Sequence, residues 1–256
     1  MLRVVRASTA TAPNRQLTEL RARKGEGNAS WLRRTSASSG IVLFGGTSVA
    51  DLRLRFAQSV FRDDLTPSHW SLAGLLVDEA TFLSVPLDLE GDVSAVPPSN
   101  GIRTCAVADH DDPDRYPNVA VLHFAAEGDA VQSAVEQVRR QRSLLDIPAL
   151  IVAWLGYVWA VDDRDPLASG HGIPSAAFVE AVHSVANIEL TPGVASASSC
   201  PEAIWQSAKW WDGYYRESAR LAAAPGVPRS PGHAVPQVPS GRYVIRRPVA
   251  QSAPDG

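Results

Sequence analysis

Residues 40–77 read GIVLFGGTSVADLRLRFAQSVFRDDLTPSHWSLAGLLV, and this stretch contains the first predicted strand and helix of the domain. The uncharged run Ile41–Phe44 is closed by two glycines and predicts a short buried strand. Thr47 follows at a position where it can cap a helix that runs to about residue 61. Helical spacing supports that helix through three apolar residues: Leu52, Phe56 and Val60. The first half of the stretch therefore predicts a strand followed by a helix.

The rest of the chain separates into an early group of strands and a late group of helices. Four strand candidates come first: Trp70–Val77, Thr81–Leu87, Arg103–Ala108 and Asn118–Phe124. Four helix candidates follow, at about residues 127–145, 148–160, 174–186 and 200–223. Because the strands precede the helices, the order predicts an α+β domain with a mainly antiparallel sheet packed against helices.

Charge divides the chain of 256 residues into three parts. Residues 1–34 carry eight basic and two acidic side chains, and residues 224–256 carry four basic and one acidic side chain. The total charge of −3 therefore leaves −12 for residues 35–223. We expect a folded acidic domain at 35–223, a flexible basic arm before it, and a disordered, proline-rich basic tail after it.

The same charge pattern constrains the partners. A body that binds nucleic acid would be basic, so the acidic domain predicts no nucleic-acid partner. The basic arms could instead contact an acidic partner or a membrane surface. The longest uncharged apolar run, Ile147–Val161, has about 15 residues, fewer than the roughly 20 that a membrane-spanning helix needs. Since the N-terminus also lacks an apolar signal segment, we expect a cytoplasmic protein.

The chain has two cysteines, Cys105 and Cys200, which exclude a disulfide-stapled scaffold. No CxxC pair is available for zinc, and we expect neither a metal nor another cofactor. Cys105 lies in the middle of a strand candidate and is interpreted as a structural thiol.

Cys200 stands at the start of the last helix candidate. Ser199 and Glu202 match the capping-box pattern S-x-x-E, and Pro201 fits the first helical turn. This assignment places Cys200 at the first helical position, beside unpaired backbone N–H groups and the positive end of the helix dipole. Both features stabilise a thiolate, so Cys200 is a candidate nucleophile. The alternative is a small buried residue at a helix start.

A thiolate enzyme also needs a general base, and the chain offers six histidines. His69 precedes the apolar strand WSLAGLLV, where a rigidly held imidazole can face a helix N-terminus. His123, in the middle of a strand candidate, is the second choice.

Three short motifs occur in a recognisable order: Gly40-Ile41-Val42-Leu43-Phe44, Ser68-His69-Trp70 and Ser199-Cys200-Pro201-Glu202-Ala203-Ile204-Trp205. This order resembles the circularly permuted papain-like cysteine hydrolases, the NlpC-related group that includes the lecithin–retinol acyltransferase-like enzymes. The resemblance covers about residues 40–88 and 197–212. The sequence departs from the family pattern at Ile41 (usually aspartate), at Trp70-Ser71 (usually two small residues) and at Pro201 (usually serine).

The resemblance implies a permuted papain-like fold with Cys200 as nucleophile and His69 as general base and then acid. It also implies a third polar residue after the hairpin, for which Ser84 and Asp88 are the candidates; the family often has glutamate at the position of Ser84. The implied activity is that of an amidase or thiol protease, which cleaves a peptide or other amide through an acyl–Cys200 intermediate. Two alternatives stay open: an acyltransferase or phospholipase that acts on a lipid acyl substrate, and a catalytically inactive interaction module.

Overall fold

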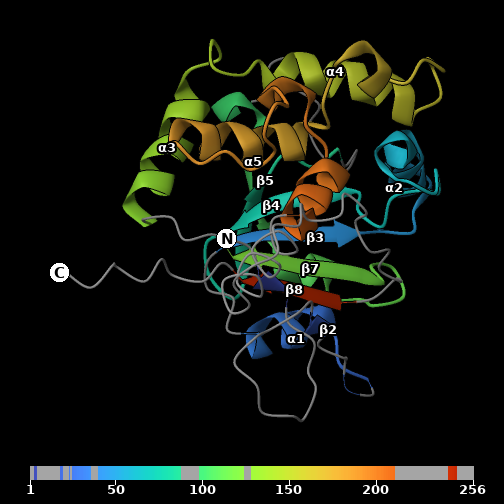
Figure 1. Cartoon of the computed structure of the whole chain (residues 1–256), viewed down its shortest axis with the longest axis vertical. Helices are drawn as coiled ribbons and strands as arrows, with labels where there is room; N and C mark the ends of the chain where they lie inside the picture. The colour runs from blue at the N-terminus through green and yellow to red at the C-terminus, as the bar shows by residue number, and fades with distance from the viewer. Residues whose placement is uncertain are drawn as a thin grey trace, which may run out of the picture.

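The computed structural model describes residues 3–4, 18–19, 23, 25–35, 40–87, 98–123, 128–210 and 242–246. Over these residues one β-sheet carries a layer of helices on one face and the short helix α1 (Asn28–Arg34) on the other (Figure 1). The architecture is therefore α+β, as the order of strands and helices in the sequence predicts.

Five antiparallel strands form the main part of the sheet, in the order β7-β3-β4-β5-β6. Their bounds are Gly40–Gly45 for β3, Leu72–Leu76 for β4, Thr81–Ser84 for β5, Arg103–Ala106 for β6 and Asn118–His123 for β7. The central strand β3 pairs with both β4 and β7, with Val42 opposite Gly74 on one side and opposite Val121 on the other. This confirms the prediction of a mainly antiparallel sheet.

The sheet continues beyond β7 through strands that come from the two ends of the chain. β8 (Arg242–Arg246) runs parallel to β7, while β1 (Arg3–Val4) and β2 (Thr18–Glu19) pair antiparallel with β8. The expected disordered tail thus contributes a strand to the sheet.

The strand β3 is buried on both faces, which explains why its sequence is an uncharged run. Ile41 and Leu43 belong to the core cluster beneath the helical layer, whereas Val42 and Phe44 belong to a second cluster on the side of α1. All four side chains are 0% exposed. Alternation along an extended strand sends successive side chains into these two cores.

Among the described residues, the helical layer consists of five α-helices. The bounds are Val49–Ala57 for α2, Gly128–Arg140 for α3, Ile147–Val158 for α4 and Pro174–Val185 for α5, and the fifth helix is described over residues 201–210. Short 3-10 helices lie between these elements: Gln58–Phe61 (η1), Pro98–Gly101 (η2), Val107–His110 (η3), Leu167–Ser169 (η4) and Ser196–Ser198 (η5). No helix among these residues is long and apolar enough to cross a membrane.

The helix α1 lies inside the expected N-terminal arm, yet it packs against the sheet. Its Trp31 and Leu32 are 0% and 2% exposed, and the side-chain amide of Asn28 donates to the backbone oxygens of His110 and Tyr116, at 2.8 and 2.9 Å. The folded region therefore begins before residue 35.

The helix α2 forms as predicted, but its cap and its orientation differ from the expectation. Ser48, not Thr47, caps it, because the Ser48 hydroxyl accepts from the Asp51 N–H while the Asp51 carboxylate accepts from the Ser48 N–H. The side chains that face the protein interior are Leu54 and Ala57. The three residues whose spacing predicted the helix point outward instead: Leu52, Phe56 and Val60.

Candidate functional site

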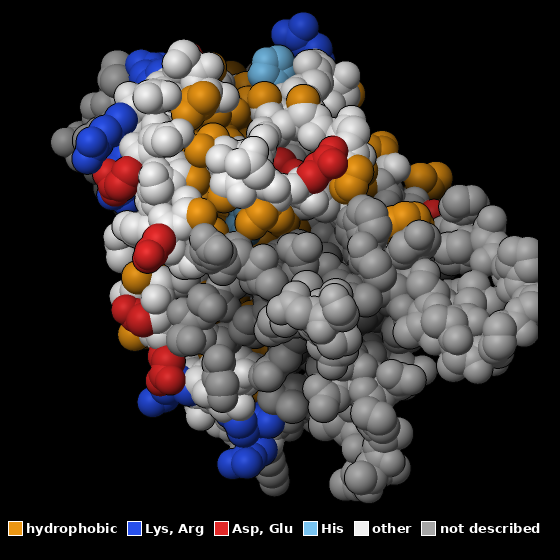
Figure 2. All heavy atoms as spheres, turned by 60° about the vertical axis from the view of Figure 1, so that its left-hand side comes forward, with side chains coloured by type: hydrophobic (Ala, Val, Ile, Leu, Met, Phe, Trp, Pro, Cys, Tyr) orange, Lys and Arg blue, Asp and Glu red, His pale blue; other side chains and the backbone are white. Residues whose placement is uncertain are grey.

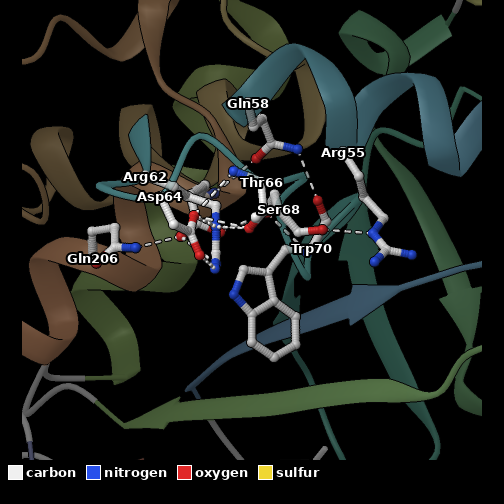
Figure 3. A network of polar contacts seen from close by, with 9 residues as sticks. Arg55, Gln58, Arg62, Asp64, Thr66, Ser68, Trp70 and Gln206 are labelled. Atoms are coloured by element: carbon white, nitrogen blue, oxygen red, sulfur yellow. Dashed lines mark hydrogen bonds and ion pairs between the residues drawn. The ribbon is translucent and has the colours of Figure 1, made fainter. Parts of the chain in front are cut away.

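The segment Ser68-His69-Trp70 is a fixed turn immediately before β4. The Ser68 hydroxyl donates to the carboxylate of Glu202 at 2.6 Å and accepts from the N–H of Trp70 at 2.9 Å. From α2, Arg55 Nε donates to the backbone oxygen of Ser68 at 2.6 Å. In Figure 3, Arg55 lies on one side of Ser68, while Arg62, Asp64 and Gln206 lie on the other. The turn therefore has little freedom to move.

Glu202 is the centre of this polar network and is 0% exposed. Besides Ser68, its carboxylate accepts from the side-chain amide of Gln206 and lies 3.5 Å from the guanidinium of Arg62. Its backbone N–H donates to Gln58 Oε1 at 2.8 Å, and Gln58 Nε2 donates in turn to the backbone oxygen of Trp70 at 2.8 Å. The network joins the first turn of the helix at residues 201–210 to the start of β4. A hydrogen bond from Ser68 to Glu202 thus connects the two motifs directly.

Cys200 occupies the N-cap of that helix rather than its first helical position. The first intrahelical bond of the helix runs from the N–H of Ile204 to the backbone oxygen of Cys200, at 3.2 Å. The backbone N–H groups of Glu202 and Ala203 lie close enough to the thiol to lower its pKa. Ser199, the expected cap, instead donates its hydroxyl to Glu180 at 3.4 Å. The helix begins one residue later than the sequence predicts, so Cys200 takes the N-cap position that was expected for Ser199.

The thiol of Cys200 is 0% exposed and lies in an apolar cluster with Leu54, Trp154 and Ile173. Burial raises its pKa to about 12, and the charge of Glu202 adds to this, against the lowering effect of the N–H groups of Ala203 and Glu202. The expectation that the helix start stabilises a thiolate is therefore wrong for this arrangement, because desolvation outweighs the helix N-terminus.

Ser84 ends β5 and is also 0% exposed. Its hydroxyl donates to the backbone oxygen of Ala73 in β4, at 2.6 Å. This bond fixes the hydroxyl between two strands of the sheet. Asp88, the other candidate for the third polar residue, lies outside the described residues.

His69 is half-buried, and its ring lies 6.2 Å from that of Trp70 in an edge-on arrangement. Its backbone oxygen lies so close to Gly45 that any Cβ at that glycine would overlap it. Position 45 therefore needs glycine for the close approach of β3 to the turn. The second-choice base, His123, falls in β7, and its side chain is outside the described residues.

Cys105 lies in β6, half-buried, and packs against the cluster that contains Phe44 and Phe82. This position agrees with its interpretation as a strand thiol of structural character.

The helix that packs directly across β4 is α5, an arrangement that the sequence motifs did not indicate. Ser175, in its first turn and 1% exposed, accepts a hydrogen bond from the N–H of Ala73 at 3.2 Å. The sequence placed Glu202 in a capping box, and both Glu202 and Ser68 in the motifs of the resemblance, but it did not indicate that the two side chains bind each other. The sequence offered one signal for the role of Glu202. This glutamate precedes the apolar residues Ala203-Ile204-Trp205, so its carboxylate lies next to a helix face that is expected to be buried.

Among the described residues no group of three or more His, Cys, Asp or Glu side chains is arranged to hold a metal ion. Comparison with protein-family models, with curated proteins and with solved structures finds no match to this chain. The candidate site is thus defined by its own geometry: a rigid turn at His69, a buried carboxylate network and a buried thiol.

Proposed function

We propose that this chain is a non-catalytic binding protein built on a permuted papain-like frame. Support for the frame comes from the order of β3, α2, the His69 turn, the β4–β5 hairpin and the late helix that begins after Cys200. This proposal develops the third of the functions that the motifs leave open, the interaction module.

The observation that carries the proposal is the state of Cys200. A thiol nucleophile must reach its substrate and must be deprotonated at working pH. Cys200 is 0% exposed, and burial raises its pKa to about 12. The hydroxyl of Ser84 is engaged, because it donates a hydrogen bond to the backbone oxygen of Ala73. These groups stabilise a packed interior and leave no activated nucleophile among them.

The competing proposal is a cysteine hydrolase, or a lipid acyltransferase, with an acyl–Cys200 intermediate. It would need the start of the last helix to separate from Leu54 and Ile173, so that a substrate could reach the buried sulfur. Both activities make the same prediction about the thiol, because each requires a thiolate near neutral pH.

Thiol labelling separates the two proposals, because the chain has only two cysteines. The full-length protein is treated with iodoacetamide at pH 7, and the labelled peptides are followed by mass spectrometry. We expect Cys105, which is half-buried, to react first, and Cys200 to react at a comparable rate only after unfolding in urea.

The variants Cys105→Ala and Cys200→Ala assign each signal to one residue. Rapid labelling of Cys200 in the folded protein would contradict the proposal, and so would amide or phospholipid turnover that is lost in Cys200→Ala. Turnover that persists in Cys200→Ala would also contradict a non-catalytic protein, though not the inert state of this thiol.

A further inference from the structure

A polar pocket lies between the second half of α5 and the loop that leads into η5. Its volume is about 340 Å³, which is within the range of small-molecule sites. Ser184, Asn187 and Glu189 are exposed and line its outer part. Glu180 also lines the pocket but is only 3% exposed. The pocket therefore places a buried carboxylate within reach of a ligand.

The loop holds the Glu180 carboxylate through neutral donors. One carboxylate oxygen accepts from the N–H of Thr191 at 3.1 Å, and the other accepts from the hydroxyl of Ser199 at 3.4 Å. Among the described residues, no Lys, Arg or His forms an ion pair with Glu180. A buried carboxylate without a counter-charge is costly to keep ionised, and burial raises the pKa of Glu180 accordingly.

A second buried group beside Glu180 also lacks a partner. Thr191 is 4% exposed, and its hydroxyl finds no hydrogen-bond partner among the described residues. It lies close enough to the Glu180 carboxylate to lower the pKa of that group. Buried polar side chains in folded proteins nearly always have a partner. A ligand that brings both a positive charge and N–H donors would satisfy the carboxylate and the hydroxyl together.

We propose that this pocket binds an aliphatic amine as its ammonium cation, with Glu180 as the buried counter-charge. The inference names a ligand for the binding function proposed above, and it rests on that function. An ammonium group has three N–H donors, enough for Glu180, the Thr191 hydroxyl and one further acceptor in the pocket. Because Glu189 lines the exposed part of the same pocket, a second ammonium on the ligand would meet a second carboxylate.

The geometry favours an ammonium group over other charged ligands. A guanidinium binds a carboxylate through both oxygens at once, whereas each oxygen of Glu180 already accepts a hydrogen bond from the protein. A metal ion needs several ligating groups, and no set of three or more His, Cys, Asp or Glu side chains in the described part of the chain is arranged to hold one. An anion would be repelled by the two glutamates.

Selection of a cation has to come from the pocket itself. Figure 2 shows acidic and basic side chains in small separate patches on the face that it presents, so the described surface there has no broad field to collect cations. Charges on the surface are also screened over about 10 Å at ordinary salt concentrations. The affinity for an ammonium should therefore depend on Glu180 and Glu189 at short range.

The test uses isothermal titration calorimetry on the full-length protein with two linear molecules, 1,4-diaminobutane and 1,4-butanediol. The diol keeps the polar ends and the length but lacks the charge. We expect the diamine to bind with a Kd below about 1 mM, and the diol to bind at least about tenfold more weakly. Glu180→Gln keeps the shape of the side chain and removes its charge, so it should weaken diamine binding by at least about tenfold.

Two further variants keep the test decisive if Glu180→Gln does not fold, which circular dichroism checks. Glu189→Gln changes an exposed side chain of the pocket and should weaken diamine binding about threefold. Glu136→Gln, in α3 and outside the pocket, is the matched control and should bind like the wild type. The proposal is overturned if the diamine does not bind, if the diol binds equally well, or if the folded glutamine variants of the pocket bind the diamine as tightly as the wild type.

Two more probes identify the source of the ammonium group. Nα-acetyl-lysine amide that binds as tightly as the diamine would assign the pocket to a lysine side chain of a peptide, whereas weaker binding would assign it to a free amine. Calcium that displaces the diamine would make the pocket a metal site and overturn the proposal. None of these results changes the labelling of Cys200, so failure of this inference is distinguishable from failure of the proposed function.

Discussion

At the scale of single residues, Glu202 is the side chain on which the site depends most. It is 0% exposed, and its carboxylate is satisfied by Ser68, Gln206 and Arg62. Glu202→Ala would leave a buried hydroxyl and a mostly buried guanidinium without this acceptor. We expect the free energy of unfolding to fall by about 3 kcal/mol, measured by urea denaturation.

Glu136→Ala is the matched control for this substitution. Glu136 also lies in a helix and pairs with arginines, Arg139 and Arg140, but it is much more accessible to solvent. Surface ion pairs contribute little, so we expect a loss below about 1 kcal/mol. Similar losses in the two variants would show that the Glu202 network does not stabilise the fold.

A second residue-scale prediction concerns His183, in α5. The ring is 3% exposed, its Nδ1 lies 2.8 Å from the backbone oxygen of Val179, and burial lowers its pKa from 6.5 to about 4. Between these two pH values the unfolded chain binds a proton that the folded chain does not. The free energy of unfolding should therefore fall by up to ~3 kcal/mol as the pH is lowered from 6.5 to 4.

Urea denaturation at several pH values tests this dependence in the wild type and in His183→Gln. The variant cannot take up that proton, so its stability should fall less over the same pH window. An equal fall in both proteins would assign the pH dependence to other groups.

Cys200 shows how far local sequence can predict a site. The sequence identified a helix start at this cysteine, and the helix is there. It could not weigh burial, because the residues that enclose the sulfur, such as Trp154 and Ile173, are distant in the sequence. Raising the pKa of the thiol from 9.0 to about 12 corresponds to ~4 kcal/mol against the thiolate. A helix N-terminus contributes only about 0.3–1 kcal/mol in its favour.

At the scale of elements, two neighbouring hydroxyl residues could cap α2, and the structure shows that Ser48 does so. Ser48 forms a reciprocal capping box with Asp51, whereas the Thr47 hydroxyl donates to the backbone oxygen of Arg115 at 3.2 Å. We expect Ser48→Ala to lower the free energy of unfolding by about 1 kcal/mol. Thr47→Ala should lower it less, as measured by urea denaturation of both variants, and the reverse order would restore Thr47 as the cap.

The orientation of α2 could not be predicted from periodicity alone. Spacing shows that Leu52, Phe56 and Val60 share a face, but it does not show whether that face meets the core or a partner. Packing decides, because Leu54 and Ala57 fit against Trp154 of α4. The strands β3 and β4 were predictable within two residues because their apolar runs are bounded by glycine and by a polar turn.

At the scale of the whole molecule, the two ends of the chain belong to the sheet more than their composition indicates. A high content of proline and arginine predicted a disordered tail, yet the short alternation Tyr243-Val244-Ile245 within it forms part of β8. Likewise, α1 packs on the sheet through Trp31 and Leu32, which belong to the core cluster that contains Val42 and Phe44. The composition of a long segment does not reveal a short strand or helix within it. Residues 242–246 form a strand because they pair with the edge of β7.

This arrangement predicts different effects for two truncations of the tail. A chain that ends at Ser240 lacks β8, so the backbone of β7 loses its parallel partner and exposes an edge whose Val119, Val121 and Leu122 are 0% exposed in the intact protein. Unpaired edges favour aggregation. We expect the thermal midpoint to fall by at least about 5 °C and the protein to elute as larger species in size-exclusion chromatography.

The control chain ends at Arg246 and keeps all the pairs between β7 and β8. Because it loses ten residues and keeps every strand that the structure describes, we expect its thermal midpoint and elution to match those of the full chain. Equal behaviour of the two truncations would mean that β8 contributes nothing to stability, and the fold would then be complete at the five antiparallel strands. A loss confined to the shorter chain would instead show that residues 242–246 close the sheet beside β7.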